Sequence, residues 1–184
     1  MAFDEKFHKM QFKRLTARDI SYLAILIALE IVAAEFLNIK IFPKVLELSF
    51  GFVPLALCGM LFGPVPAMVV GVIADILGAL LAGSEFFLGF TLTALLEGLF
   101  YGMLLHKPAQ TGKQSLVFAC AAQGLVSVIC FAFCNTLWTY IMGYGRSWTY
   151  VTTRVIVNAV AYPVYTAVLY LMMRYRKILE TAIR

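Results

Sequence analysis

Polar and charged side chains recur at one-turn spacing near the C-terminal end of an otherwise apolar chain. Arg154, Asn158 and Tyr162 are four residues apart, so they share one face of a helix, and Tyr165 continues the same side. Arg154 falls roughly one turn inside this apolar stretch, where an unpaired cation costs on the order of a few kcal/mol. A guanidinium, an amide and phenols on one face therefore predict that the helix faces a partner or a water-filled cavity.

An amide and several aromatic rings form a second set of candidate ligand-binding groups. Asn135 lies one turn before Trp138, deep in the preceding apolar stretch, where a buried amide requires a polar partner. Another apolar stretch opens with three phenylalanines and carries two polar groups further along: Phe86, Phe87, Phe90, Glu97 and Tyr101. Cations, aromatic rings, amides and carboxylates together suit a flat heteroaromatic ligand with an acidic tail.

The elements that carry these residues are membrane-spanning helices. Hydrophobic residues make up 62% of the 184 residues and charged residues 14%, with a mean hydropathy of +0.87, which is too apolar for a soluble domain. We expect an all-α integral membrane protein, with residues 1–184 as a single domain and about six spans in a compact bundle. The expected spans are Ile20–Leu37, Ser49–Phe62, Ala67–Ala82, Phe86–Leu105, Leu116–Met142 and Tyr150–Met173.

Small residues predict that the third and fourth of these spans pack closely. Small residues four apart let transmembrane helices approach one another closely. One set of residues shows this spacing, and another lies on a single helical face at intervals of three and four. The first set is Ala94, Gly98 and Gly102 in the fourth span, and the second is Gly71, Asp75, Gly78 and Ala82 in the third.

The distribution of cations predicts the orientation. An even number of spans puts both termini on one side, and that side collects all but four of the 15 Lys and Arg residues. By the positive-inside rule the termini are then cytoplasmic. The four outward cations are Lys40, Lys44, Arg146 and Arg154; interfacial anchoring is the alternative reading of Lys40 and Arg146. Trp148, beside the same outer turn, is either a ligand contact or a residue of the interfacial aromatic belt.

Other chemistries find little support. Cys58, Cys120, Cys130 and Cys134 all lie in apolar stretches without a neighbouring His, so we interpret them as packing thiols and expect no metal or cofactor. Thr111-Gly112-Lys113 lacks the upstream glycine of a phosphate-binding loop, so any ATP hydrolysis must come from a partner. We expect a protein that is not an enzyme and binds no nucleic acid.

Four motifs occur in order along the chain: Ser49–Pro54 (SFGFVP), Cys58–Pro64 (CGMLFGP), Ala74–Gly78 (ADILG) and Gly89–Ala94 (GFTLTA). In these motifs the chain resembles the substrate-binding (S) subunits of energy-coupling factor (ECF) vitamin transporters, and most closely the folate type. The resemblance implies an extracellular folate pocket. We assign Arg154 and one or both of Lys40 and Lys44 to the ligand carboxylates, Trp138 and the phenylalanines to stacking, and Asn135, Asn158 and Glu97 to the pterin.

The first span carries a small-residue seam, which consists of Ala17, Ser21, Ala24 and Ala28. In the family that this chain resembles, an Ala-xxx-Ala pattern on the first span contacts a transmembrane coupling subunit, and Ala24 and Ala28 match it. The alternative is close packing inside the chain's own bundle. Glu30 lies on the other side of the same helix.

The sequence thus predicts a protein of the prokaryotic cell membrane that captures folate outside and delivers it with a coupling subunit and two cytoplasmic ATPases. Another water-soluble vitamin such as pantothenate, riboflavin or thiamine is the nearest alternative. Asp75 and Glu30 could instead serve a self-sufficient, proton-coupled transporter, but no repeat or broken-helix pair accompanies them. An intramembrane enzyme would need clustered metal-binding acids, whereas the acids here are dispersed in sequence.

Overall fold

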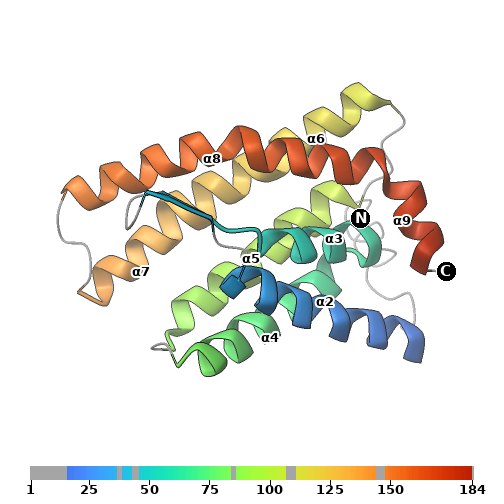
Figure 1. Ribbon diagram of the computed structural model, residues 1–184, viewed down its shortest axis with the longest axis horizontal. Helices are drawn as coiled ribbons and strands as arrows, with labels where there is room; N and C mark the ends of the chain where they lie inside the picture. The colour runs from blue at the N-terminus through green and yellow to red at the C-terminus, as the bar shows by residue number, and fades with distance from the viewer. Residues whose placement is uncertain are drawn as a thin grey trace, which may run out of the picture.

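A computed structural model describes residues 16–36, 39–42, 46–83, 86–106, 111–143 and 148–183. Its helices are α2 (Ala17–Phe36), α3 (Phe52–Phe62), α4 (Pro64–Ala82), α5 (Leu88–Leu105), α6 (Gly112–Leu125), α7 (Asn135–Ile141), α8 (Trp148–Arg174) and α9 (Arg176–Ile183). Between α6 and α7, residues Val126–Cys134 form a π-helix, η1, and the three elements make one continuous rod. Successive helical rods run in alternating directions. The first residues of α2 and the whole of α9 lie at the same end of the bundle (Figure 1).

The predicted all-α fold omitted one short hairpin. Strands β1 (Ile39–Phe42) and β2 (Leu46–Leu48) pair antiparallel, with Ile39 opposite Leu48 and Lys40 opposite Glu47. The pairing shifts register between Lys40 and Phe42. The sequence predicts only a connection between the spans Ile20–Leu37 and Ser49–Phe62, although Ile39, Ile41 and the intervening Lys40 show the alternation typical of a strand.

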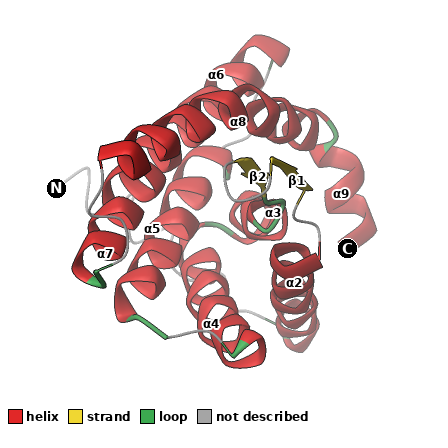
Figure 2. Ribbon diagram, turned by 60° about the vertical axis from the view of Figure 1, so that its left-hand side comes forward, coloured by secondary structure: helices red, strands yellow, loops and turns green. Residues whose placement is uncertain are grey.

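Helix α3 lies in the middle of the bundle, surrounded by α2, α4, α5 and α8 (Figure 2). Its residues are apolar all round, as expected for a buried helix, and most of them are excluded from the surface, including Leu55, Cys58 and Met60. Pro54 sits in the first turn, where a missing N–H costs no helical hydrogen bond. Gly63, at φ +92°, ends the helix in a conformation that favours glycine and leads directly into α4.

Helices α4 and α5 pack closely through small residues, as the sequence predicts. A Cβ atom added to Gly98 would lie 2.5 Å from the carbonyl oxygen of Ala67, and one added to Gly71 would lie 2.7 Å from that of Ala94. A Cβ on Gly102 would overlap Pro64. Gly78 differs, because no atom of the described residues lies within 4 Å of its added Cβ. Gly78 lines the cavity described below.

Within the described residues, four helical stretches are long and apolar enough to cross a membrane. They are Pro64–Ala82, Leu88–Leu105, Gly112–Ile141 and Val151–Arg174. Helix α3 is apolar but only 11 residues long, about 16 Å of rise. Helix α2 carries four charged residues within its 20 residues: Arg18, Asp19, Glu30 and Glu35. The predicted boundaries of the four long spans agree with the structure to within a few residues.

The C-terminal helix α9 was not predicted. It forms hydrogen bonds with the C-terminal end of α5. Nη1 of Arg176 donates hydrogen bonds to the carbonyl oxygens of Leu105 and His106, at 3.2 and 2.9 Å. Its Nε pairs with Glu180 one turn further along, at 2.6 Å. A ring nitrogen of His106 in turn lies 3.2 Å from the carbonyl oxygen of Met60. These contacts satisfy carbonyl groups that have no partner within their own helices.

Candidate ligand-binding site

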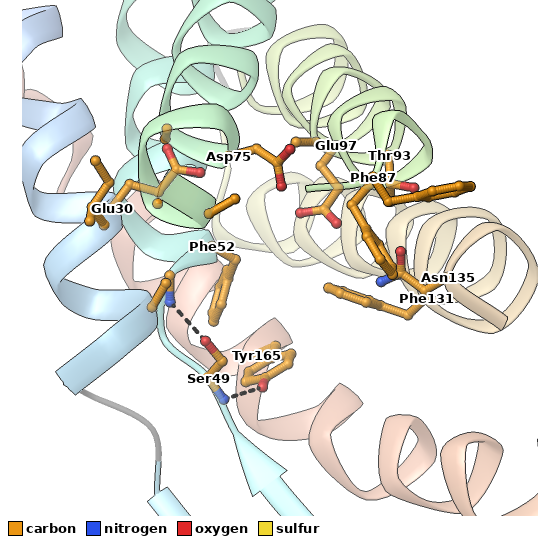
Figure 3. Close-up of a pocket in the computed structure, with 18 of the residues that line it drawn as sticks. Glu30, Ser49, Phe52, Asp75, Phe87, Thr93, Glu97, Phe131, Asn135 and Tyr165 are labelled. Atoms are coloured by element: carbon orange, nitrogen blue, oxygen red, sulfur yellow. Dashed lines mark hydrogen bonds between the residues drawn. The ribbon is translucent and has the colours of Figure 1, made fainter. Parts of the chain in front are cut away.

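A cavity of about 590 Å³ lies among α2, α3, α4, α5, η1, α7 and α8 (Figure 3). Its volume falls in the range that accommodates a cofactor-sized or drug-sized molecule. Because consecutive helices alternate in direction, residues far apart in the sequence meet at this point, from Glu30 in α2 to Tyr165 in α8. The cavity is therefore a product of the whole bundle rather than of any one element.

One side of the cavity is an acidic wall, which consists of Glu30, Asp75 and Glu97. These residues come from α2, α4 and α5, and Figure 3 shows their carboxyl groups in the same part of the cavity. The Oγ1 of Thr91 donates a hydrogen bond of 2.6 Å to Oδ2 of Asp75. One of the three acids thus has part of its hydrogen-bonding capacity filled from within the protein.

Two acceptor atoms of cavity-lining residues are buried without a hydrogen-bond partner among the described residues. They are Oε2 of Glu30 and Oδ1 of Asn135. Leaving a buried acceptor unsatisfied costs about 1–3 kcal/mol, and proteins rarely tolerate it without a reason. Both atoms belong to residues of the same cavity, so a ligand with hydrogen-bond donors would satisfy them.

Aromatic rings cover the other sides. Phe87 packs edge-on against Phe90, with ring centroids 5.9 Å apart, and Phe131 of η1 lies near Phe87 and Asn135 (Figure 3). Phe52 and Tyr165 form a tilted pair at 4.5 Å on the side nearest the hairpin. Rings on several sides with polar groups between them are suited to a flat, partly polar ligand.

The chain between the hairpin and α3 is fixed to α8 at this place. The backbone N–H of Ser49 donates a 3.0 Å hydrogen bond to the phenolic oxygen of Tyr165, as Figure 3 shows. Gly51 approaches α2 so closely that an added Cβ would lie 3.1 Å from the Cβ of Ala34. Ser49, Gly51 and Phe52 all line the cavity, so this segment forms part of its wall.

The structure brings half of the predicted ligand contacts together around the cavity. Six of the predicted residues line it: Phe86, Phe87, Phe90, Glu97, Asn135 and Asn158. They come from the start of α5 and its preceding segment, from α7 and from α8. The amide nitrogen of Asn158 donates to the carbonyl oxygen of Arg154 at 2.9 Å, which fixes that amide against its own helix.

Three predicted contacts lie outside the cavity lining. Nε1 of Trp138 donates a 3.0 Å hydrogen bond to Oγ1 of Thr93, and the indole packs on Phe87 at 5.9 Å, so it supports residues that do line the cavity. Tyr101 is fully buried and donates to Oε1 of Gln123 at 3.1 Å. Arg154 is half-buried on α8, one turn before Asn158 towards the hairpin end.

For two of the remaining predicted residues the structure describes only the backbone, and the third lies outside the described residues. Lys40 lies in β1, paired with Glu47, and Trp148 is the first residue of α8. Lys44 lies outside the described residues. The small-residue seam on α2 is exposed along its whole length, at Ala17, Ser21, Ala24 and Ala28, so it does not pack inside this bundle.

Sequence reasoning missed several residues of the wall. Glu30 and Asp75 were not predicted as ligand contacts, and neither were Phe52 and Phe131. Tyr165, by contrast, is expected on the cavity-facing side of its helix and does line the cavity. The available signal was the polarity of single acids within apolar helices, which marks intramembrane function. For Phe131 no such signal existed, because it belongs to η1, where the backbone N–H of Asn135 bonds the carbonyl of Cys130, five residues earlier. A π-helix rotates the following side chains relative to an α-helix, and it is often found at functional sites.

Comparisons with known proteins agree with this architecture. A family model described as the S component of an ECF-type riboflavin transporter matches residues 14–177. The folate transporter FolT of Clostridium novyi is 33% identical over 150 residues, which cover 81% of this chain and 84% of the relative. FolT of Leuconostoc mesenteroides is 30% identical over 176 residues, 92% of each chain.

A solved structure has the same fold. A crystal structure of FolT bound with folic acid superposes with a TM-score of 0.74 and 28% identity, covering 86% of this chain and 94% of that one. The predicted resemblance to folate-type S subunits is confirmed by these matches. With a family model matching most of its length and relatives at 30% identity or more, the chain belongs to the S-component family of ECF-type transporters.

Proposed function

We propose that this chain is the folate-binding subunit of an ECF-type importer. The observation that carries the proposal is the cavity of about 590 Å³, with an acidic wall on one side and aromatic rings on the others. Folate combines a flat pterin, an aminobenzoate and a glutamate, so it can use both kinds of surface. The relatives named as folate transporters and the related structure bound with folic acid support this choice.

Riboflavin is the second candidate, because the matching family model is described as a riboflavin transporter. Riboflavin is also flat and aromatic, and its volume would suit the same cavity. It lacks the two carboxylates of folate, so the outer cations would have no counter-charge on the ligand. Folate would therefore bind cations at the hairpin end of the protein through its carboxylates, whereas riboflavin would not.

The proposed ligand position follows from the lining residues. The pterin stacks among Phe86, Phe87 and Phe90 and forms hydrogen bonds with Asn135, Asn158 and Glu97. The glutamate carboxylates extend towards Arg154 and the hairpin, where Lys40 and Lys44 contribute positive charge. Trp138 acts from behind Phe87, which it contacts directly.

The transporter family and the four long apolar helices indicate a multi-pass membrane protein. We propose that α2 and α3 also span, which gives six spans with both termini cytoplasmic in a prokaryotic cell membrane. Helix α3 is too short to cross alone, but it is enclosed by its neighbours, and non-helical backbone at membrane depth is tolerated where protein surrounds it. The excess of cations on the side of the termini supports this orientation.

Delivery requires partners in this proposal. The exposed seam at Ala24 and Ala28 docks on a transmembrane coupling subunit, and two cytoplasmic ATPases drive the cycle, while this chain hydrolyses no ATP. Small residues on an exposed helix face allow the close approach of another helix.

Mass spectrometry of small molecules retained by the purified protein tests the ligand assignment. Protein produced in cells supplied with both vitamins should retain folate species in preference to riboflavin. Retention of riboflavin in place of folate would contradict the proposal and favour the second candidate.

A further inference from the structure

The cavity wall offers more hydrogen-bond acceptors than donors. Glu30, Asp75 and Glu97 contribute carboxyl oxygens, and Oδ1 of Asn135 adds an amide acceptor. Among the described residues that line the cavity there is no Lys or Arg. A ligand that fills this space must therefore supply N–H or O–H donors of its own.

The unfilled acceptors belong chiefly to two of the three acids. Asp75 already accepts from Thr91, whereas Oε2 of Glu30 is buried with no partner among the described residues. Among the described residues, none donates a hydrogen bond to the carboxyl group of Glu97, which faces the same part of the cavity in Figure 3. Glu30 and Glu97 are thus the acids best placed to accept from a ligand.

The proximity of three carboxyl groups is also unfavourable while no ligand donor reaches them. Glu30, Asp75 and Glu97 cannot all carry a negative charge without mutual repulsion, which is strong where water is scarce. A metal ion is not the natural remedy, because no group of three acidic, His or Cys residues in the described part of the chain has metal-binding geometry. A planar edge carrying several N–H groups can reach the acids without such geometry.

The aromatic rings define how a flat ligand would lie. Phe87 and Phe131 lie on the side of the cavity that carries Asn135; Glu30 lies on the opposite side in Figure 3, and Glu97 lies between them. A heterocycle stacked near these rings presents its edge, and not its face, to Glu30 and Glu97.

We propose that Glu30 and Glu97 bind the donor-bearing edge of the ligand's heterocycle, and that this edge determines which vitamin the cavity accepts. The inference rests on the proposed folate-binding function and makes it more specific. A pterin carries an exocyclic amino group beside a ring N–H, an arrangement that one carboxylate can bind with two parallel hydrogen bonds.

The other vitamins fit this wall less well. Riboflavin places a single imide N–H between two carbonyl oxygens, which would meet the carboxyl groups acceptor to acceptor. Pantothenate has no aromatic ring and no amino group beside a ring N–H, so it offers neither a surface for stacking nor the paired donors. The acidic wall therefore selects by the pattern of donors, and the acidic tail of folate contributes affinity at the other end.

The experiment compares two ligands across two variants. Binding of folate and of its 2-desamino-2-methyl analogue, which lacks the exocyclic amino group, is measured by titration calorimetry with purified full-length protein. The wild type should prefer folate by roughly ten- to a hundredfold, the range for losing hydrogen bonds to a charged group. In Glu30→Gln and Glu97→Gln, this preference should fall to about threefold or less, because the amide that replaces each carboxyl group no longer offers two acceptors.

Glu180→Gln is the matched control, because it makes the same change in α9, outside the cavity. It should keep the wild-type preference. If folate binds but both cavity variants retain the full preference for it, the inference is wrong while folate binding stands. If the wild type binds no folate at all, the proposed function fails and the inference fails with it. A variant that does not fold leaves the wild-type comparison decisive, since equal affinity for the two ligands would overturn the inference.

Discussion

Arg154 is the described cation closest to the cavity along α8, one turn before Asn158, which lines it. If its guanidinium pairs with a desolvated ligand carboxylate, Arg154→Ala should weaken folate binding by about 2–5 kcal/mol, because the carboxylate would lose its partner. The dimethyl ester of folate, which keeps the shape of the tail but carries no carboxylate, is the matched ligand and should bind wild type and variant alike. A loss of folate affinity below about 0.5 kcal/mol would place Arg154 at the membrane interface instead.

Trp138 is predicted to act through Thr93 and Phe87 rather than by touching the ligand. Trp138→Phe keeps an aromatic ring but removes the Nε1–H donor to Thr93. Folate affinity should fall by about 1 kcal/mol, the usual value of one hydrogen bond. In a double-mutant cycle with Thr93→Val, the second substitution should then cost little more than the first. Fully additive losses would show that the two residues act independently.

At the level of single residues, the sequence predicted which polar residues belong to the site more reliably than it predicted which atoms form hydrogen bonds. Asn135 and Glu97 could be identified because polar groups are rare deep in apolar helices. The partner of Tyr101 could not, because Gln123 lies 22 residues away and becomes its acceptor only when α6 packs on α5. The position of Trp138 behind Phe87 could not be predicted for a similar reason, since its distance from the cavity depends on the side to which α7 rotates.

The packing of α4 on α5 depends on glycine at the points of closest approach. Gly98→Ala should lower the free energy of unfolding by about 1–3 kcal/mol, because its Cβ would lie 2.5 Å from a backbone oxygen that cannot move freely. Gly78→Ala is the matched control on the facing helix, since nothing lies within 4 Å of its Cβ.

The two glycine variants can be compared by thermal unfolding of the ligand-free protein in detergent. Gly78→Ala should unfold at the wild-type temperature or slightly above it, since alanine favours a helix by up to about 1 kcal/mol. Equal melting temperatures for both variants would contradict the close-packing account of α4 and α5.

Elements with a strong apolar or small-residue pattern were predicted well. The four long spans and the close contact between α4 and α5 follow from hydrophobic length and glycine spacing. The hairpin was missed because β1 has only four residues and β2 only three, so a segment of this length between two predicted spans is interpreted as a loop. The π-helix at Val126–Cys134 left no mark in the sequence, because its residues are as apolar as those of an α-helix there.

For the whole molecule, the exposed seam on α2 separates ligand binding from delivery. Ala24 and Ala28 are exposed, while Glu30 on the same helix lines the cavity. Replacing both alanines by Leu should leave folate binding by the isolated chain nearly unchanged, because neither side chain faces the ligand. The same change should abolish ATP-dependent uptake and co-purification with a coupling subunit, since bulky side chains keep the partner helix away.

Two results would argue against this division of labour. Loss of folate binding in the double variant would mean that the seam supports the bundle itself. Accumulation of folate in vesicles that contain only the wild-type chain would identify a self-sufficient transporter, in which Glu30 and Asp75 would be candidates for proton coupling.

The most direct test of the central claim is a calorimetric titration of the purified chain with folate, followed by a competition with riboflavin. We predict saturable binding of one folate per chain, with riboflavin unable to displace it at comparable concentrations. Absence of heat with folate, together with saturable binding of riboflavin, would contradict the account and assign the cavity to the other vitamin.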